Sequence, residues 1–76
     1  MAENPLSVLK SIVGKTVMVR MQDGFEAQGK LVSVDDCMNI SLSDSEWIGE
    51  GGNRKRLGDL HVKGENLVLV AVSPSS

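Results

Sequence analysis

The sequence has few residues of a type and spacing suited to catalysis or metal binding. His61 is the only histidine and Cys37 the only cysteine, so no second soft ligand stands at the spacing of a zinc site. No potential nucleophile is accompanied by a base. We therefore expect no metal, no cofactor and no enzymatic activity, and we expect His61 to be a surface or subunit-interface residue.

Two polar clusters are better suited to binding. Residues 35–39 read Asp-Asp-Cys-Met-Asn, which taken alone is typical of a turn at a strand corner. Arg54, Lys55 and Arg56 form a basic cluster in what we expect to be the longest exposed loop, about residues 49–55. Such a cluster could bind phosphates with an affinity that falls as salt rises, although a solvated loop is its commoner role.

The overall composition argues against a broad nucleic-acid footprint. Ten acidic residues outweigh eight Lys and Arg residues, for a formal net charge of −2, so any contact with a polyanion must be local. Phe25 and Trp47 are the only aromatic residues, too few for the stacking platform of a monomeric single-strand binder. We expect Trp47 to pack within the protein or at a subunit contact.

One short helix and five short strands are predicted to position these clusters. Asn4 and Pro5 suit a helix start, and apolar residues at helical spacing extend the helix over about residues 5–13. From Thr16 onward apolar and polar residues alternate, which predicts successive antiparallel strands. Gly29 lies in the middle of the second strand, where a glycine marks a bend. The expected fold is mainly β: an N-terminal α-helix followed by a strongly bent five-stranded antiparallel sheet.

The last strand carries an uninterrupted apolar run, residues 67–72 (Leu-Val-Leu-Val-Ala-Val). A strand covered on one face would alternate, so this run is predicted to be buried on both faces. So short a chain buries only roughly 60% of its unfolded surface, and a strand from another copy could supply cover and close a ring. The alternative is the central strand of a monomeric barrel. Residues 73–76 are expected to form a disordered tail.

Two segments resemble the two sequence motifs of the Sm-like (LSm) family. The first includes Asp23-Gly24, Gly29-Lys30-Leu31 and residues 34–42 (VDDCMNISL), and the second is residues 61–70 (HVKGENLVLV). The opening NPLSVL is similar to that of archaeal Sm-like proteins. The resemblance implies a single Sm-like domain over residues 1–76, with the motif regions at about 15–48 and 58–72.

The resemblance also implies an assembly and a ligand. Sm-like open barrels form rings of six or seven copies, with strand four of one subunit paired to strand five of the next, and a homoheptamer is favoured here. Such rings bind single-stranded, U-rich RNA at the pore. In this interpretation the Asn39 amide matches the O4 and N3 edge of uracil, and Asp35 orients that amide. The positions that match the family's RNA-binding residues are Asp35, Cys37, Met38, Asn39, Lys63, Gly64 and Glu65.

Two of these positions depart from the family pattern. Lys63 stands where most members have Arg, and Cys37 where many have His, Tyr or Phe. A base stacked between a ring and a guanidinium gains roughly 1–3 kcal/mol, which Lys and Cys cannot provide. We expect weaker or less U-selective binding. A scaffold ring with little or no oligo(U) binding, or a subunit of a mixed ring, stays open as an alternative.

The sequence shows no apolar run near the roughly 18 residues of a membrane span and no secretory signal. A lone thiol fits a reducing compartment. We expect a cytoplasmic protein, or a nuclear one if the source is eukaryotic, that contacts no membrane and acts in RNA processing, stability or chaperoning.

Overall fold

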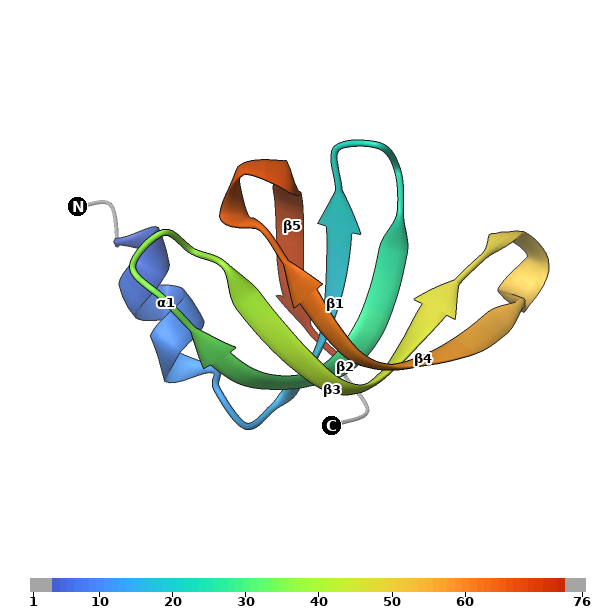
Figure 1. The fold of residues 1–76 in the computed structure, drawn as a ribbon, viewed down its shortest axis with the longest axis horizontal. Helices are drawn as coiled ribbons and strands as arrows, with labels where there is room; N and C mark the ends of the chain where they lie inside the picture. Colours follow the sequence, from blue (N-terminus) through green and yellow to red (C-terminus); the bar gives the residue numbers. More distant parts are fainter. Residues whose placement is uncertain (1–3, 74–76) are drawn as a thin grey trace.

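The structure is a computed structural model that describes residues 4–73, one helix followed by five strands (Figure 1). Among these residues no helix is long and apolar enough to cross a membrane. Two one-turn 3-10 helices, η1 (Glu50–Gly52) and η2 (Gly64–Asn66), connect the last strands. The main elements are α1 (Pro5–Ser11), β1 (Thr16–Met21), β2 (Glu26–Val34), β3 (Ile40–Ile48), β4 (Arg54–Val62) and β5 (Leu67–Val72).

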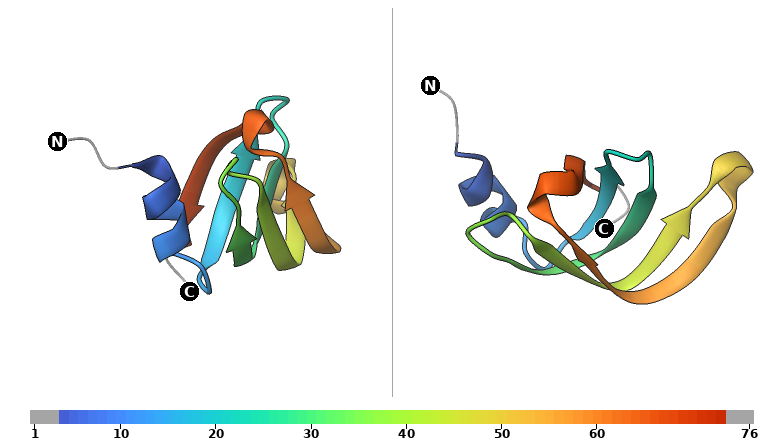
Figure 2. Two further views of the ribbon diagram at one scale, coloured as in Figure 1. Left: turned by 60° about the vertical axis from the view of Figure 1, so that its left-hand side comes forward. Right: turned by 45° about the horizontal axis from the view of Figure 1, so that its top comes forward.

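The five strands form one bent sheet that does not close on itself. The strand order is β4-β3-β2-β1-β5, and every neighbouring pair is antiparallel. Figure 2 shows α1 at one end of the molecule, beside β5 and the β2–β3 loop, while the β3–β4 hairpin extends away from it. The predicted fold class is confirmed. β4 and β5 are the two edge strands of the sheet.

The helix starts as predicted and ends earlier. The side chain of Asn4 accepts a hydrogen bond from the backbone N–H of Leu6 at 2.9 Å, which caps the first turn. The helix stops at Ser11 instead of about residue 13. It stops there because the chain turns to pair with the sheet, where the N–H of Gly14 donates to the carbonyl of Leu31 at 2.8 Å.

The core follows the predicted alternation. Buried residues alternate along β1, along β2 up to Leu31 and at the start of β3, as expected for side chains that alternate across a sheet. The buried apolar residues are Leu9, Val17, Val19, Ala27, Leu31, Ile40, Leu42 and Val62.

Three small residues allow the sheet to bend. The β2–β3 register shifts at Gly29, and a Cβ there would lie 3.0 Å from the Cα of Ser45. Ser45 is buried, pairs with Gly58 of β4, and donates its hydroxyl to the Gly58 carbonyl at 2.6 Å. A larger residue at Gly29 would overpack this crossing, which typically costs about 1–3 kcal/mol. The bend therefore lies at Gly29, as the sequence predicted.

Within one protomer, strand β5 is less buried than the sequence predicted. It is an edge strand paired only with β1, so it is not the centre of a barrel. None of its residues is buried, and Val68, Leu69 and Val72 are 58%, 43% and 43% exposed. The apolar run that was predicted to be covered on both faces is thus an exposed apolar edge.

Two boundary predictions were wrong. The connection between β3 and β4 is only residues 49–53, no longer than the β2–β3 connection at 35–39, because Arg54 already pairs with Ile48. Ser73 is buried, and its N–H donates to the carbonyl of Thr16 at 2.9 Å, so it continues the β5–β1 pairing instead of starting a tail. Residues 74–76 of the predicted tail lie outside the described residues.

Candidate nucleic-acid interface

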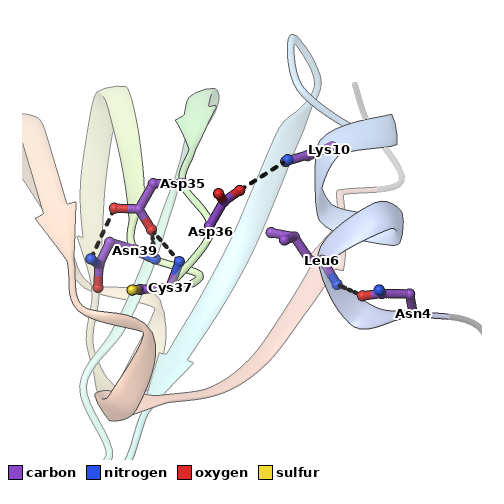
Figure 3. Close-up of polar contacts among 7 residues, drawn as sticks. All are labelled: Asn4, Leu6, Lys10, Asp35, Asp36, Cys37 and Asn39. Atoms are coloured by element: carbon purple, nitrogen blue, oxygen red, sulfur yellow. Dashed lines mark hydrogen bonds and ion pairs between the residues drawn. The ribbon is translucent and has the colours of Figure 1, made fainter.

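The β2–β3 loop, residues 35–39, is organised around one carboxylate (Figure 3). Oδ1 of Asp35 accepts the backbone N–H groups of Cys37 and Asn39, both at 2.9 Å, and Oδ2 accepts the side-chain amide of Asn39 at 3.0 Å. The N–H of Asp35 donates to the Asn39 carbonyl at 3.0 Å and closes the loop. The polar segment therefore forms the turn that its composition predicts, and Asp35 holds the amide nitrogen of Asn39.

The other end of the Asn39 amide is held by the β4–β5 connection. Oδ1 of Asn39 accepts the backbone N–H of Gly64 at 2.8 Å. The reversed amide would place a nitrogen donor against the Gly64 N–H and an oxygen against the Asp35 carboxylate, so only one orientation satisfies both contacts. One amide N–H and one lone pair on the amide oxygen remain for a ligand.

Glycine is required at position 64 because the two loops approach closely there. A Cβ at Gly64 would collide with the carbonyl oxygen of Cys37 and lie 2.9 Å from the carbonyl carbon and oxygen of Met38. On the other side of this connection, the side-chain amide of Gln22 donates to the carbonyl of Glu65 at 3.1 Å. The β4–β5 connection is thus held against the β2–β3 loop by backbone contacts as well as by Asn39.

A hollow of about 450 Å³ opens beside the fixed amide. Asp35, Asn39 and Lys63 border it, so the protomer brings together these predicted residues from two motifs about 25 positions apart in the chain. Three apolar residues, Val34, Ile40 and Val62, also border the hollow, and Ile40 and Val62 belong to the buried core. The chemistry of the hollow is that of a hydrogen-bonding pocket with one nearby cation and no metal-ligand cluster among residues 4–73.

The chain matches known proteins over nearly its whole length. The family model described as "LSM domain" matches residues 7–72. The chain belongs to the LSM domain family. The snRNP Sm-like protein of Pyrococcus abyssi is 39% identical over 75 residues, which cover 99% of this chain and 97% of that protein.

Solved structures agree with this assignment. The SmAP1 heptamer of P. aerophilum superimposes with a TM-score of 0.87 at 32% identity and covers 97% of this chain and 99% of that one. The Sm protein of Pyrococcus abyssi, solved in complex with a uridine heptamer, superimposes with a TM-score of 0.83 at 34% identity. That match covers 93% of this chain and 100% of the other.

Other predicted residues of this LSM domain lie beside the hollow without bordering it. Cys37 is exposed and contributes its backbone N–H to Asp35. Met38 and Gly64 border a separate apolar hollow of about 280 Å³ between α1 and β5. Glu65 is exposed and contributes its carbonyl to Gln22. The side chains of Asp35, Asn39 and Lys63 are therefore the centre of the candidate site.

Ser33, Ser41 and His61 border the same hollow, although they were not predicted from the sequence to lie at this site. Oγ of Ser41 lies 2.9 Å from Nδ1 of His61, its partner across the β3–β4 ladder. The strand spacing carried a signal, because Ser41 follows Asn39 by two residues and His61 precedes Lys63 by two. Residues two apart on a strand share a face.

The predicted basic cluster is not a single patch. Arg54 to Arg56 lie on β4, where alternation places Lys55 on the face opposite to the two arginines. Arg54 is engaged by Glu46 at 3.0 Å and by the side-chain oxygen of Gln28 at 3.1 Å. The hairpin that carries the cluster extends away from the helix end of the molecule (Figure 1). The cluster is therefore separate from the Asn39 site.

An exposed ion pair joins the helix to the loop of the site. Nζ of Lys10 lies 3.3 Å from Oδ1 of Asp36, and the two side chains are 51% and 90% exposed (Figure 3). Surface pairs of this kind contribute little stability. The position of the β2–β3 loop therefore depends on the hydrogen bonds of Asp35 and Asn39 more than on this pair.

These hydrogen bonds should be visible in the titration of Asp35. The side-chain hydrogen bond from Asn39, followed by the backbone N–H groups of Asn39 and Cys37, lowers the pKa of the Asp35 carboxyl from its ordinary value. The stabilisation that Asp35 contributes is present above the pKa of an unfolded aspartate, about 3.9. It is lost as the pH falls through the lower folded pKa.

We expect Asn39→Ala to raise the pKa of Asp35 toward its ordinary value, as measured by the carboxyl carbon shift in NMR titrations. Asn53→Ala at the β3–β4 tip makes the same change away from the loop and should leave that pKa as it is in the unsubstituted protein. An unchanged pKa in Asn39→Ala would contradict the hydrogen-bonding scheme.

Proposed function

We propose that this chain assembles with copies of itself into a ring, with seven subunits favoured, that binds single-stranded, U-rich RNA at its pore. Each subunit binds one nucleotide in the hollow beside Asn39. The orientation of the Asn39 amide by Asp35 and Gly64 is the observation that carries the proposal. The uridine heptamer bound by the related Pyrococcus abyssi protein supports the ligand class. We further propose that this chain acts in RNA processing, stability or chaperoning in the cytoplasm.

The remaining hydrogen-bonding groups of Asn39 suit uracil. Uracil presents the O4 acceptor beside the N3–H donor, so the free amide N–H can donate to O4 while the amide oxygen accepts from N3–H. Cytosine presents the reverse order, a donor at N4 and an acceptor at N3. Because the amide is held at both ends, it cannot turn over to accept cytosine without losing its contacts to Asp35 and Gly64.

Lys63 supplies charge at the hollow without a stacking surface. Its ammonium group attracts phosphate as a point charge, whereas a guanidinium plane would also stack on the base. Cys37 supplies no ring either, and its side chain does not border the hollow. The affinity of a single site for a nucleotide should therefore be low. A ring would raise the overall affinity, because once one site has bound an RNA strand the other sites meet that strand at high effective concentration.

The Asn39 site is tested by Asn39→Ala with fluorescein-labelled oligo(U) in fluorescence anisotropy. We expect the variant to assemble normally and to lose roughly tenfold or more in affinity, since a bidentate contact between a side-chain amide and a base edge contributes about 1–3 kcal/mol. Asn53→Ala is the matched control and should bind like the unsubstituted protein. Unchanged oligo(U) binding by Asn39→Ala would remove Asn39 from this role.

A second candidate function is a ring that scaffolds proteins, alone or as part of a mixed ring. The absence of a planar side chain at both Cys37 and Lys63 favours it. An assembled ring that binds no oligo(U) would support the scaffold, and a chain that assembles only with other Sm-like subunits would support the mixed ring.

The two open sheet edges support the ring. β4 and β5 each have one side without a strand partner within residues 4–73, and the β5 edge is apolar and exposed. Ser73 donates its N–H to β1, so by alternation the N–H groups of Val70 and Val72 point away from β1. We propose that β4 of the next copy pairs with this edge and covers the apolar run.

This pairing is tested by Val70→Pro, which removes one outward N–H and leaves the pairing with β1 in place. Proline is tolerated on an edge strand when the missing N–H faces outward. We expect native mass spectrometry to show a folded 8.1 kDa protomer, while the control Val70→Ala still forms rings. Intact rings in Val70→Pro, or a monomeric unsubstituted protein at micromolar concentration, would contradict the pairing.

A further inference from the structure

Three polar side chains form one row across the outer face of the sheet. Ser33 of β2 pairs with Ser41 of β3, and Ser41 pairs with His61 of β4. Directly paired residues of antiparallel strands have their side chains on the same face. Ile40 and Val62, the next residues along β3 and β4, are buried in the core, so the row faces away from the core.

This polar row is continuous with the proposed base site. Ser33, Ser41 and His61 border the same hollow as Asn39 and Lys63. A hollow of about 450 Å³ lies within the range of small-ligand sites. The part of a nucleotide chain adjoining a base at Asn39 would therefore lie along this row.

The Ser41–His61 pair offers an outward hydrogen-bond donor in either tautomer. If the Ser41 hydroxyl donates to Nδ1, which lies 2.9 Å away, then the imidazole carries its hydrogen on Nε2 and donates from there. If Nδ1 instead donates to Ser41, then the hydroxyl hydrogen of Ser41 is free to point outward. Ser33 adds a second, exposed hydroxyl.

Among the described residues, Asp35 and Lys63 are the two formally charged ones that border the hollow, so its formal charges balance and Lys63 is the one cation that a phosphate could contact there. Asp35 is the one acid among the described residues that border the hollow, and its carboxylate already accepts three hydrogen bonds. Lys63 follows His61 by two residues and adds a positive charge. Donors beside a cation are the groups that contact phosphate oxygens in nucleic-acid complexes.

We propose that the row Ser33–Ser41–His61 binds the phosphodiester adjoining the nucleotide whose base is held by Asn39. The inference rests on the proposed RNA-binding function and adds to it a backbone subsite. A backbone contact carries no base preference. Losing it should therefore weaken the binding of every sequence equally.

The test compares His61→Ala, Ser41→Ala and Asn39→Ala rings, confirmed by native mass spectrometry, in anisotropy titrations with oligo(U) and oligo(C). We expect His61→Ala to weaken both ligands by roughly tenfold, the loss of one hydrogen bond to a charged group, with an unchanged ratio between them. On oligo(U) with neutral methylphosphonate linkages, His61→Ala should bind like the unsubstituted ring. His61→Gln, which keeps a donor, should recover part of the loss.

Ser7→Ala on the exposed face of α1 is the matched control for Ser41→Ala. It should leave the affinities for oligo(U) and oligo(C) unchanged. If both His61→Ala and Ser41→Ala bind oligo(U) like the unsubstituted ring while Asn39→Ala does not, the backbone subsite is wrong and the base site stands. Equal losses by His61→Ala on the charged and the neutral backbone would also overturn the subsite. An unsubstituted ring that binds no oligo(U) would overturn the proposed function itself.

Discussion

The site depends on one side-chain amide that joins two loops. Asn39 donates to Asp35 in its own loop and accepts from Gly64 in the β4–β5 connection. The same contacts that hold the loops together leave the amide in a single orientation. In the proposed function, the local fold and the discrimination of uracil from cytosine would therefore have a common cause, since hydrogen bonds that fix a donor and an acceptor also fix what can pair with them.

The sheet brings those loops together, and within residues 4–73 its two edge strands each lack a partner strand on one side. Gly29, Ser45 and Gly58 permit the bend, and the bend separates the two edge strands so that β4 and β5 do not pair with each other. An exposed apolar edge such as β5 invites a further strand. The proposed ring of copies would satisfy that edge and would repeat the Asn39 site around one circle, so that several weak sites could bind one RNA strand together.

Local patterns in the sequence predicted the fold well because each has a local physical cause. The Asn4 cap and the strand alternation depend on near neighbours, and the bend was predictable because a glycine in the middle of a strand is itself a local signal. The extent of β4 was missed because cross-strand pairing with β3, which composition does not reveal, extends it to Arg54. His61 was missed at the site for the same reason, because it lies beside Ser41 only when β3 and β4 pair.

The central claim is that the oxygen of Asn39 accepts from N3–H of a uracil base. It is tested most directly by the affinity of the ring for oligomers of 3-methyluridine, which lack that hydrogen, and of 5-methyluridine, which keep it. We predict that N3 methylation abolishes measurable binding while C5 methylation changes it little. Equal affinity for the two oligomers would contradict the claim, because the fixed amide would then have no part in recognising the base.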